Sequence, residues 1–269
     1  MCPPRDSHNV SMNKPMNCLA RWKSCVRDAA VRLGYGVFDL RKDTNPAVFL
    51  PGHLQATFVR LGINCVVDVG ANVGQFASMI RGSGYTGRIV SIEPVADTYA
   101  ALSRLAQADP SWRTLNVALG RSDGEKTFNV FADRDMSSFL NPVAGLWQGT
   151  GTSCVANIQT VTVKRLDAIF DKVIEGLARP RVFLKLDTQG YDLEVAAGAN
   201  DSLRYVLGVQ TELSVVPVYQ GMPDYVDALR IFRNLGFELT GVFPVCHDQQ
   251  TGHVIEFDAV MTRRSIPEA

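Results

Sequence analysis

The sequence lacks an excess of either charge. Its 269 residues include 27 lysines and arginines against 27 aspartates and glutamates, so the formal net charge is zero. A nucleic-acid-binding surface usually needs a surplus of basic residues, and this balance therefore argues against a nucleic-acid partner. The remaining composition, with 46% hydrophobic and 20% charged residues, is ordinary for a globular protein.

Long apolar runs and paired cysteines are lacking as well. No stretch approaches the roughly 20 apolar residues of a membrane-spanning helix, and the polar first ten residues do not resemble a secretory signal. The six cysteines, at positions 2, 18, 25, 65, 154 and 246, include no C-x-x-C pair of the kind that binds zinc. We therefore expect a cytoplasmic protein without a transmembrane segment, in which Cys65 is a buried free thiol.

The first 60 residues differ in pattern from the rest. Residues 1–16 are expected to form a loosely attached leader. Residues 17–34 carry an apolar stripe at helical spacing, with arginines on the opposite side. This pattern predicts a helix that packs on the protein as a cap, and the alternative is a basic amphipathic helix that contacts a membrane or an acidic partner. We therefore predict a leader and helical cap over residues 1–60.

From residue 61 to 265, short β-rich runs alternate with helical stretches. Such alternation is typical of a mostly parallel sheet with helices on both faces. The expected strands are 63–69, 88–93, 113–119, 182–187 and 205–212, followed by an antiparallel hairpin of 237–245 and 254–261. Helices are expected to begin at residue 75 and to cover 95–107 and 223–235. Residues 120–170 break the rhythm and are interpreted as an insertion between the third and fourth strands.

The strongest local motif lies where the first predicted strand ends. The apolar run at 66–69 leads directly into Gly70-Ala71-Asn72-Val73-Gly74, and a helix follows. Glycine lets the backbone approach a ligand closely, and the N-terminus of a helix offers unpaired N–H groups. The motif is therefore interpreted as the first strand–turn–helix of a nucleotide-binding sheet.

The spacing in this motif argues against a dinucleotide. It reads G-x-N-x-G, whereas binding of a pyrophosphate requires the pattern G-x-G-x-x-G. Asn72 offers a side chain to a smaller polar group, and the methionine carboxylate of S-adenosylmethionine fits that description. A tight turn that binds no ligand is the alternative.

An acid stands at the end of the second predicted strand. Glu93 follows the run Ile89-Val90-Ser91-Ile92 and precedes Pro94. A carboxylate at this point of a nucleotide-binding unit can accept hydrogen bonds from both ribose hydroxyls. Together with the glycine turn, it predicts a ribose-binding site.

These residues together resemble the FkbM family of methyltransferases. The matching segments are 68–76, 92–94, 116–120, Ser137-Ser138, 165–167 and 184–190. The resemblance covers about residues 60–262 and implies a Rossmann-like class I α/β fold with S-adenosylmethionine as methyl donor. It also implies O-methylation of a sugar moiety or natural product, with a glycolipid or small-molecule acceptor. The chain departs from the family pattern at Asp192, where the family usually has glutamate.

The motifs also predict the residues of the cofactor site. The predicted cofactor-binding residues are Asp68, Gly70, Ala71, Asn72, Gly74, Gln75, Glu93, Pro94, Asn116 and Ala118.

Methyl transfer to a hydroxyl needs a group that removes the proton of the alcohol, either a general base or a metal ion. Asp187 and Glu212 end the fourth and fifth predicted strands, and ligands of open α/β sheets bind beyond such strand ends. If the two strands are neighbours, both carboxylates face one cleft, where they could hold a divalent cation or provide the base. The alternative is that each carboxylate only caps a following turn.

Two further side chains are candidates for the same edge. Lys185 shares a strand face with Asp187 and could orient substrate or form a structural ion pair. His247 follows the sixth predicted strand and has a pKa that suits base catalysis, although an exposed turn histidine is the more common outcome. His53 is a weaker candidate for the cap over the cofactor.

Two rival functions remain open. One is a non-catalytic scaffold that keeps a methyltransferase fold, and the other is an NAD-linked oxidoreductase. The intact Gly70, Glu93 and Asp187 argue against the first, and the glycine spacing argues against the second. No sequence motif indicates the acceptor, the metal dependence or the oligomeric state.

Overall fold

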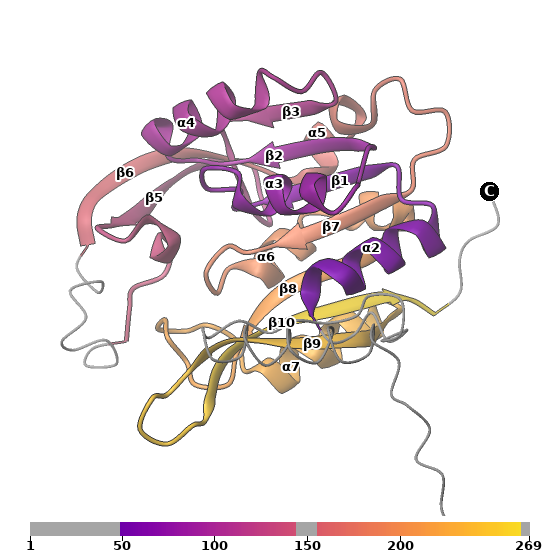
Figure 1. The fold of residues 1–269 in the computed structure, drawn as a ribbon. Helices are drawn as coiled ribbons and strands as arrows, with labels where there is room; N and C mark the ends of the chain where they lie inside the picture. Colours follow the sequence, from indigo (N-terminus) through magenta and orange to yellow (C-terminus); the bar gives the residue numbers. More distant parts are fainter. Residues whose placement is uncertain (1–48, 144–154, 265–269) are drawn as a thin grey trace, which may run out of the picture. The chain divides into compact units, whose positions relative to one another are not determined.

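The computed structural model describes residues 49–143 and 155–264 (Figure 1). The chain divides into two units, 1–45 and 46–269, and all described residues belong to the second. The predicted leader and the helix over 17–34 therefore lie outside the described residues. Among the helices of the described ranges, none is long and apolar enough to cross a membrane.

A seven-stranded sheet forms the centre of the second unit. Its strands lie in the order β3-β2-β1-β7-β8-β10-β9, and every neighbouring pair is parallel except the two pairs that involve β10. The strands are β1 Cys65–Val69, β2 Arg88–Ile92, β3 Trp112–Leu115, β7 Val182–Leu186, β8 Val206–Ser214, β9 Phe237–His247 and β10 Val254–Arg263. The sequence-based prediction of a mostly parallel sheet with a closing hairpin is confirmed.

Helices cover both faces of this sheet (Figure 1). One face packs against α2 Leu50–Leu61, α3 Gln75–Gly82 and α4 Ala96–Ala106. The other face packs against α5 Leu166–Ile174, α6 Asp192–Ala197 and α7 Tyr225–Asn234. Strand β1 is buried on both sides: Val66 packs against the face that carries α2, α3 and α4, whereas Val67 and Val69 pack against the face that carries α5, α6 and α7.

The third predicted strand is wrong in one respect. Residues 113–119 do not form one strand, because Trp112–Leu115 pairs with β2 whereas β4, Ala118–Leu119, pairs with β6 in a second sheet. Asn116 stands at the break, where its side-chain amide donates to the carbonyl oxygens of Glu93 (2.9 Å) and Pro94 (3.0 Å). This anchoring ends the run of β3, although the apolar pattern continues through it.

The predicted insertion contains a small sheet of its own. Strands β5, Gly124–Phe131, and β6, Val155–Lys164, pair antiparallel, and β4 completes the order β4-β6-β5. A 3-10 turn, η2 at Arg134–Met136, follows β5. The inner face of this second sheet packs on the start of α4, through a cluster that includes Val95, Phe128 and Val161. The domain boundary near residue 60 stays a prediction.

Candidate active site

A cavity of about 420 Å³ opens at the carboxyl ends of the central strands. Its walls come from β1, β2, β7, β8 and β10 and from the turn η2 of the second sheet. The predicted residues in its lining are Gly70, Ala71, Asn72, Gln75, Glu93, Pro94, Ala118, Lys185, Asp187 and Glu212. Four predicted residues are not in this lining: Asp68, Gly74, Asn116 and His247.

The two loop glycines are required by neighbouring protein atoms. Gly70 has a φ of 73°, and a Cβ added to it would lie 1.9 Å from the backbone oxygen of Asp187. Gly74 has a φ of 96°, and a Cβ there would lie 3.0 Å from the ring of Trp112. Both φ values favour glycine. These glycines were expected to allow the approach of a ligand. In the structure, the backbone after β7 already requires glycine at position 70, and the side chains of Trp112 and Leu102 leave little room for a larger residue at position 74.

Glu93 is held rigidly at the end of β2. Its side chain is buried, one carboxylate oxygen accepts from the backbone N–H of Asn72 (3.0 Å), and the other accepts from that of Val95 (2.9 Å). Burial raises the pKa of Glu93 to about 7, although these two hydrogen bonds and the charge of Lys185 work in the opposite direction. A carboxylate can accept about four hydrogen bonds, so Glu93 can still receive donors from a ligand in the cavity.

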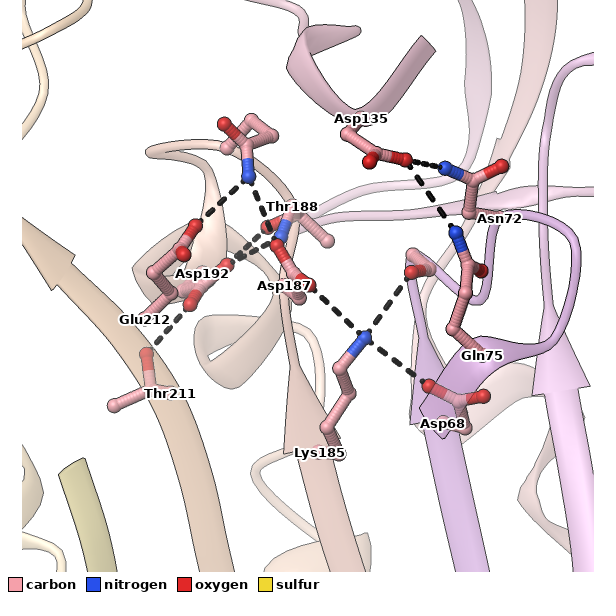
Figure 2. A network of polar contacts seen from close by, with 12 residues as sticks. Asp68, Asn72, Gln75, Asp135, Lys185, Asp187, Thr188, Asp192, Thr211 and Glu212 are labelled. Atoms are coloured by element: carbon pink, nitrogen blue, oxygen red, sulfur yellow. Dashed lines mark hydrogen bonds and ion pairs between the residues drawn. The ribbon is translucent and has the colours of Figure 1, made fainter. Parts of the chain in front are cut away.

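Lys185 joins the ends of β1 and β7 (Figure 2). Its ammonium nitrogen lies 3.2 Å from a carboxylate oxygen of Asp68, 3.2 Å from one of Asp187, and 3.1 Å from the carbonyl oxygen of Gly70. Burial alone would lower the pKa of Lys185, but Asp187 and Asp68 outweigh it and raise that pKa. Lys185 is thus a buried cation that is ion-paired with two carboxylates of the protein. This agrees with the structural ion pair that the sequence left open as one of two roles.

A chain of hydrogen bonds extends from Asp68 across the sheet. The hydroxyl of Ser91 on β2 donates to the Asp68 carboxylate (3.0 Å) and accepts from the indole N–H of Trp112 on β3 (3.0 Å). Asp68 is fully buried. It therefore supports Lys185 from below the cavity and does not line it.

Asp187 directly follows β7 and Glu212 lies on the neighbouring strand β8, which meets the condition under which both carboxylates face one cleft. One side chain connects them. The amide of Gln189 donates to Asp187 (2.9 Å) and to Glu212 (2.8 Å), while its oxygen accepts from the hydroxyl of Tyr219 (2.9 Å). Gln189 has a left-handed backbone with a φ of 52°, and its carbonyl oxygen accepts from the hydroxyl of Ser138 (2.7 Å). Burial raises the pKa of Glu212 well above its ordinary value, and Asp187 raises it further.

Asp192, the departure from the family pattern, stabilises the turn after β7. Its carboxylate accepts from the backbone N–H of Thr188 (2.8 Å), from the hydroxyl of Thr188 and from the hydroxyl of Thr211 (2.5 Å). Asp192 is buried. It therefore holds the segment that carries Asp187 and Gln189 in place.

Sequence reasoning missed two polar residues in the floor of the cavity. Gln210 lies on the same face of β8 as Glu212, and Asp258 lies opposite Glu212 on β10. Burial raises the pKa of Asp258 to about 6. Gln210 could have been predicted, because residues two apart on a strand share a face and Glu212 was already a candidate. Asp258 could not, because its position opposite Glu212 depends on the register of the hairpin.

Asp135 in η2 was also missed. One of its carboxylate oxygens accepts from the side-chain amides of Asn72 and Gln75, the latter at 3.5 Å (Figure 2). Asn72 was predicted to contact a carboxylate of the cofactor, but in the structure it contacts a carboxylate of the protein. No sequence pattern links η2 to the glycine loop, because the contact joins two different sheets.

The structure does not bring the two histidine candidates to the cavity. His247 is exposed at the end of β9 and is not in the cavity lining. His53 is buried between α2 and β9, where its ring contacts Thr240 (3.1 Å) and packs on Phe243. Neither histidine is placed to act as a base in this cavity.

The profile of the methyltransferase FkbM domain matches residues 68–239, more than half of the chain. This protein belongs to the FkbM methyltransferase family. The match begins at Asp68 on β1 and ends within β9, so it covers the ends of β1, β2, β7 and β8 at the cavity, whereas β10 lies beyond it. No curated protein sequence matches this FkbM methyltransferase.

Solved structures with a similar fold include two methyltransferases and a fibrillarin with bound S-adenosylmethionine. Magnesium protoporphyrin IX methyltransferase from Synechocystis PCC 6803, with bound S-adenosylmethionine, has a TM-score of 0.44 and 12% identity, and the match covers 90% of this chain and 96% of that one. The 1,6-didemethyltoxoflavin-N1-methyltransferase from Burkholderia thailandensis has a TM-score of 0.43 and 10% identity, with 94% and 93% covered. Aeropyrum pernix fibrillarin has a TM-score of 0.42 and 12% identity, with 74% of this chain but only 66% of that one covered.

These likenesses are distant and concern the fold alone. Family membership and fold together make this chain a Rossmann-like, S-adenosylmethionine-dependent methyltransferase. Within residues 49–143 and 155–264, no group of three or more histidine, cysteine, aspartate or glutamate side chains is arranged to hold a metal ion.

Proposed function

We propose that this FkbM methyltransferase transfers the methyl group of S-adenosylmethionine to a hydroxyl oxygen of a sugar moiety or natural product of the glycolipid or polyketide type. The observation that carries the proposal is the carboxylate of Asp187. It lines the cavity, is ion-paired with Lys185, and receives a hydrogen bond from Gln189. A carboxylate oriented in this way is suited to remove the proton of an alcohol.

The residues of the cavity fit the cofactor. Glu93 provides a buried carboxylate at the place where a ribose diol would donate its two hydroxyl protons. Val95, Val117 and Ala118 provide an apolar wall for an adenine ring. The cavity volume of about 420 Å³ lies within the usual range of small-molecule sites.

In the proposed reaction, Asp187 holds the acceptor hydroxyl and takes its proton as the new C–O bond forms. When bound, S-adenosylmethionine would supply an electrophilic methyl group on a sulfonium, whose C–S bond breaks so that S-adenosylhomocysteine is the leaving group. Lys185 and Gln189 fix the orientation of Asp187, and such fixed alignment can contribute roughly 7–11 kcal/mol to catalysis. Burial and the neighbouring charge of Asp187 raise the pKa of Glu212, which favours its protonated form. We therefore assign the role of the base to Asp187 rather than to Glu212.

Calorimetry and a methyl-transfer assay test the proposal. The protein should bind S-adenosylmethionine and not NAD, which separates a methyltransferase from an oxidoreductase. It should also transfer a labelled methyl group to a component of a glycolipid and natural-product extract, which a non-catalytic scaffold would not do. Binding without any transfer would favour the scaffold.

The Asp187→Asn variant tests the base. It keeps the shape of the side chain and removes its charge, so we expect methyl transfer to fall about 10²- to 10⁴-fold while cofactor affinity changes little. Asp171→Asn, on the exposed side of α5, is the matched control and should retain activity. Full activity of Asp187→Asn would place the chemistry elsewhere.

Chelation separates a metal-free base from a metal site. If Asp187 acts as a base without a metal, EDTA should leave the wild-type activity unchanged. If Asp187 and Glu212 share a divalent cation, EDTA should abolish activity and Mg²⁺ or Mn²⁺ should restore it. We propose the metal-free case. The cytoplasmic location and the absence of a nucleic-acid partner stay predictions.

A further inference from the structure

The amide groups of the glycine loop are already directed at a carboxylate. Asn72 and Gln75 are the polar side chains that this loop presents to the cavity, and both donate to the same oxygen of Asp135. The amide of each of these two side chains thus already donates to a carboxylate of the protein. Asp135 lines the cavity, and its second carboxylate oxygen has no hydrogen-bond partner within residues 49–143 and 155–264.

The local charge favours a cation in this corner. Burial raises the pKa of Asp135, and the nearby negative charges of Asp133 and Asp187 raise it further. The neighbouring cations are committed elsewhere: Lys185 is paired with Asp68 and Asp187, and Arg134 donates to the Thr98 hydroxyl (2.9 Å). Within residues 49–143 and 155–264 no cation forms an ion pair with Asp135, so the amides of Asn72 and Gln75 are the groups that stabilise its charged form.

We propose that Asp135 binds the α-ammonium group of the methionine moiety of S-adenosylmethionine and of its product, S-adenosylhomocysteine. This inference rests on the proposed function, because it requires that the cavity hold this cofactor. The ammonium donates to the second oxygen of Asp135 while Asn72 and Gln75 hold the other oxygen. The role differs from the sequence-based expectation, which assigned Asn72 to the methionine carboxylate.

The position of Asp135 gives the second sheet a part in cofactor binding. Asp135 belongs to η2, which follows β5, whereas the rest of the cofactor corner belongs to β1 and β2 of the central sheet. The predicted insertion would therefore complete the cofactor site as well as shape the acceptor site.

Three ligands that share the adenosine but differ in the amino-acid part test this role. S-adenosylhomocysteine has the ammonium and the carboxylate, its decarboxylated aminopropyl analogue has only the ammonium, and 5′-methylthioadenosine has neither. In Asp135→Asn the amide oxygen can still accept from Asn72, so the loop contact is kept while the charge is lost. We expect affinity to fall about ten- to hundredfold for the two amine-bearing ligands and to stay within about twofold for 5′-methylthioadenosine. Asp97→Asn, an exposed acid 3.8 Å from Arg134, is the matched control and should change none of the three.

Each contrary result has a distinct meaning. An equal loss for all three ligands, or a fall in the unfolding temperature of Asp135→Asn, would show that Asp135 only holds the loop, and would overturn the inference. A loss for S-adenosylmethionine without one for S-adenosylhomocysteine would assign Asp135 to the sulfonium and overturn it too. If the wild-type protein bound none of these adenosine ligands, the proposed function would fail with it. Normal wild-type binding with an unchanged Asp135→Asn would overturn the inference alone.

Discussion

At the scale of single residues, Glu93 combines burial with two backbone hydrogen bonds, so its carboxylate has one orientation before a ligand binds. If it accepts the ribose hydroxyls, Glu93→Ala leaves those hydroxyls without a partner, at a cost of about 1.5–3 kcal/mol. We expect about ten- to hundredfold weaker binding of S-adenosylhomocysteine by calorimetry.

The control for this prediction is Glu125→Ala, which removes an exposed acid of β5 and should bind like the wild type. A folded Glu93→Ala variant with unchanged affinity would remove Glu93 from the cofactor site. Thermal unfolding of the variant is needed as well, because the N–H groups of Asn72 and Val95 also lose their acceptor.

At the scale of elements, the junction of β1 and β7 depends on Gly70. Gly70→Ala combines a positive φ with a Cβ that would lie 1.9 Å from the Asp187 carbonyl. Gly176 has a similar φ of 77°, but a Cβ there would meet nothing within 4 Å. Gly176→Ala should therefore lose about 1–2 kcal/mol of unfolding free energy from backbone strain alone, and Gly70→Ala clearly more.

Urea denaturation of the two variants measures this difference. Equal losses of unfolding free energy would mean that the backbone at Asp187 moves away from the added Cβ without destabilising the protein, so that the clash is unimportant. A larger loss in Gly70→Ala should be accompanied by weaker methyl transfer, because the displaced atom belongs to Asp187 itself.

Most elements could be predicted because their signals are local. The apolar runs, the glycine turn and the acids Asp187 and Glu212 are each recognisable from a few neighbouring residues. That the two acids share a cleft depended on β7 and β8 being neighbours, and the structure shows that they are. Asp135 and the break at Asn116 could not be predicted, because both depend on contacts between segments far apart in the chain. The raised pKa of Asp258 could not be predicted either, because the burial of this residue depends on the register of the hairpin.

At the scale of the whole molecule, buried carboxyls make stability depend on pH. Burial raises the pKa of Glu93 from 4.5 to about 7 and that of Asp258 from 3.8 to about 6, and it also raises that of Glu212. Between about pH 4 and pH 7 the folded protein therefore binds protons that the unfolded chain has released. Stability must fall as the pH rises through this window.

Urea denaturation at pH 5 and pH 7.5 should accordingly give a lower free energy of unfolding at the higher pH. The carboxyls of Asp109 and Glu194 have lowered pKa values, but both side chains are partly exposed, so solvent screens part of their opposing effect. Asp258→Asn should flatten the pH dependence, since it removes one of the groups responsible. A stability that rises steadily with pH would contradict these shifts.

The hydrogen-bonded chain from Asp68 through Ser91 to Trp112 gives the protein an intrinsic optical probe. Trp112 is the single tryptophan within residues 49–143 and 155–264, and its indole N–H is one step from the carboxylate that holds Lys185. The emission colour of an indole follows the electric field along its ring. With Trp22 and Trp147 replaced by phenylalanine, the fluorescence of this methyltransferase would report the charge beneath its cavity, without any label and before any acceptor is known.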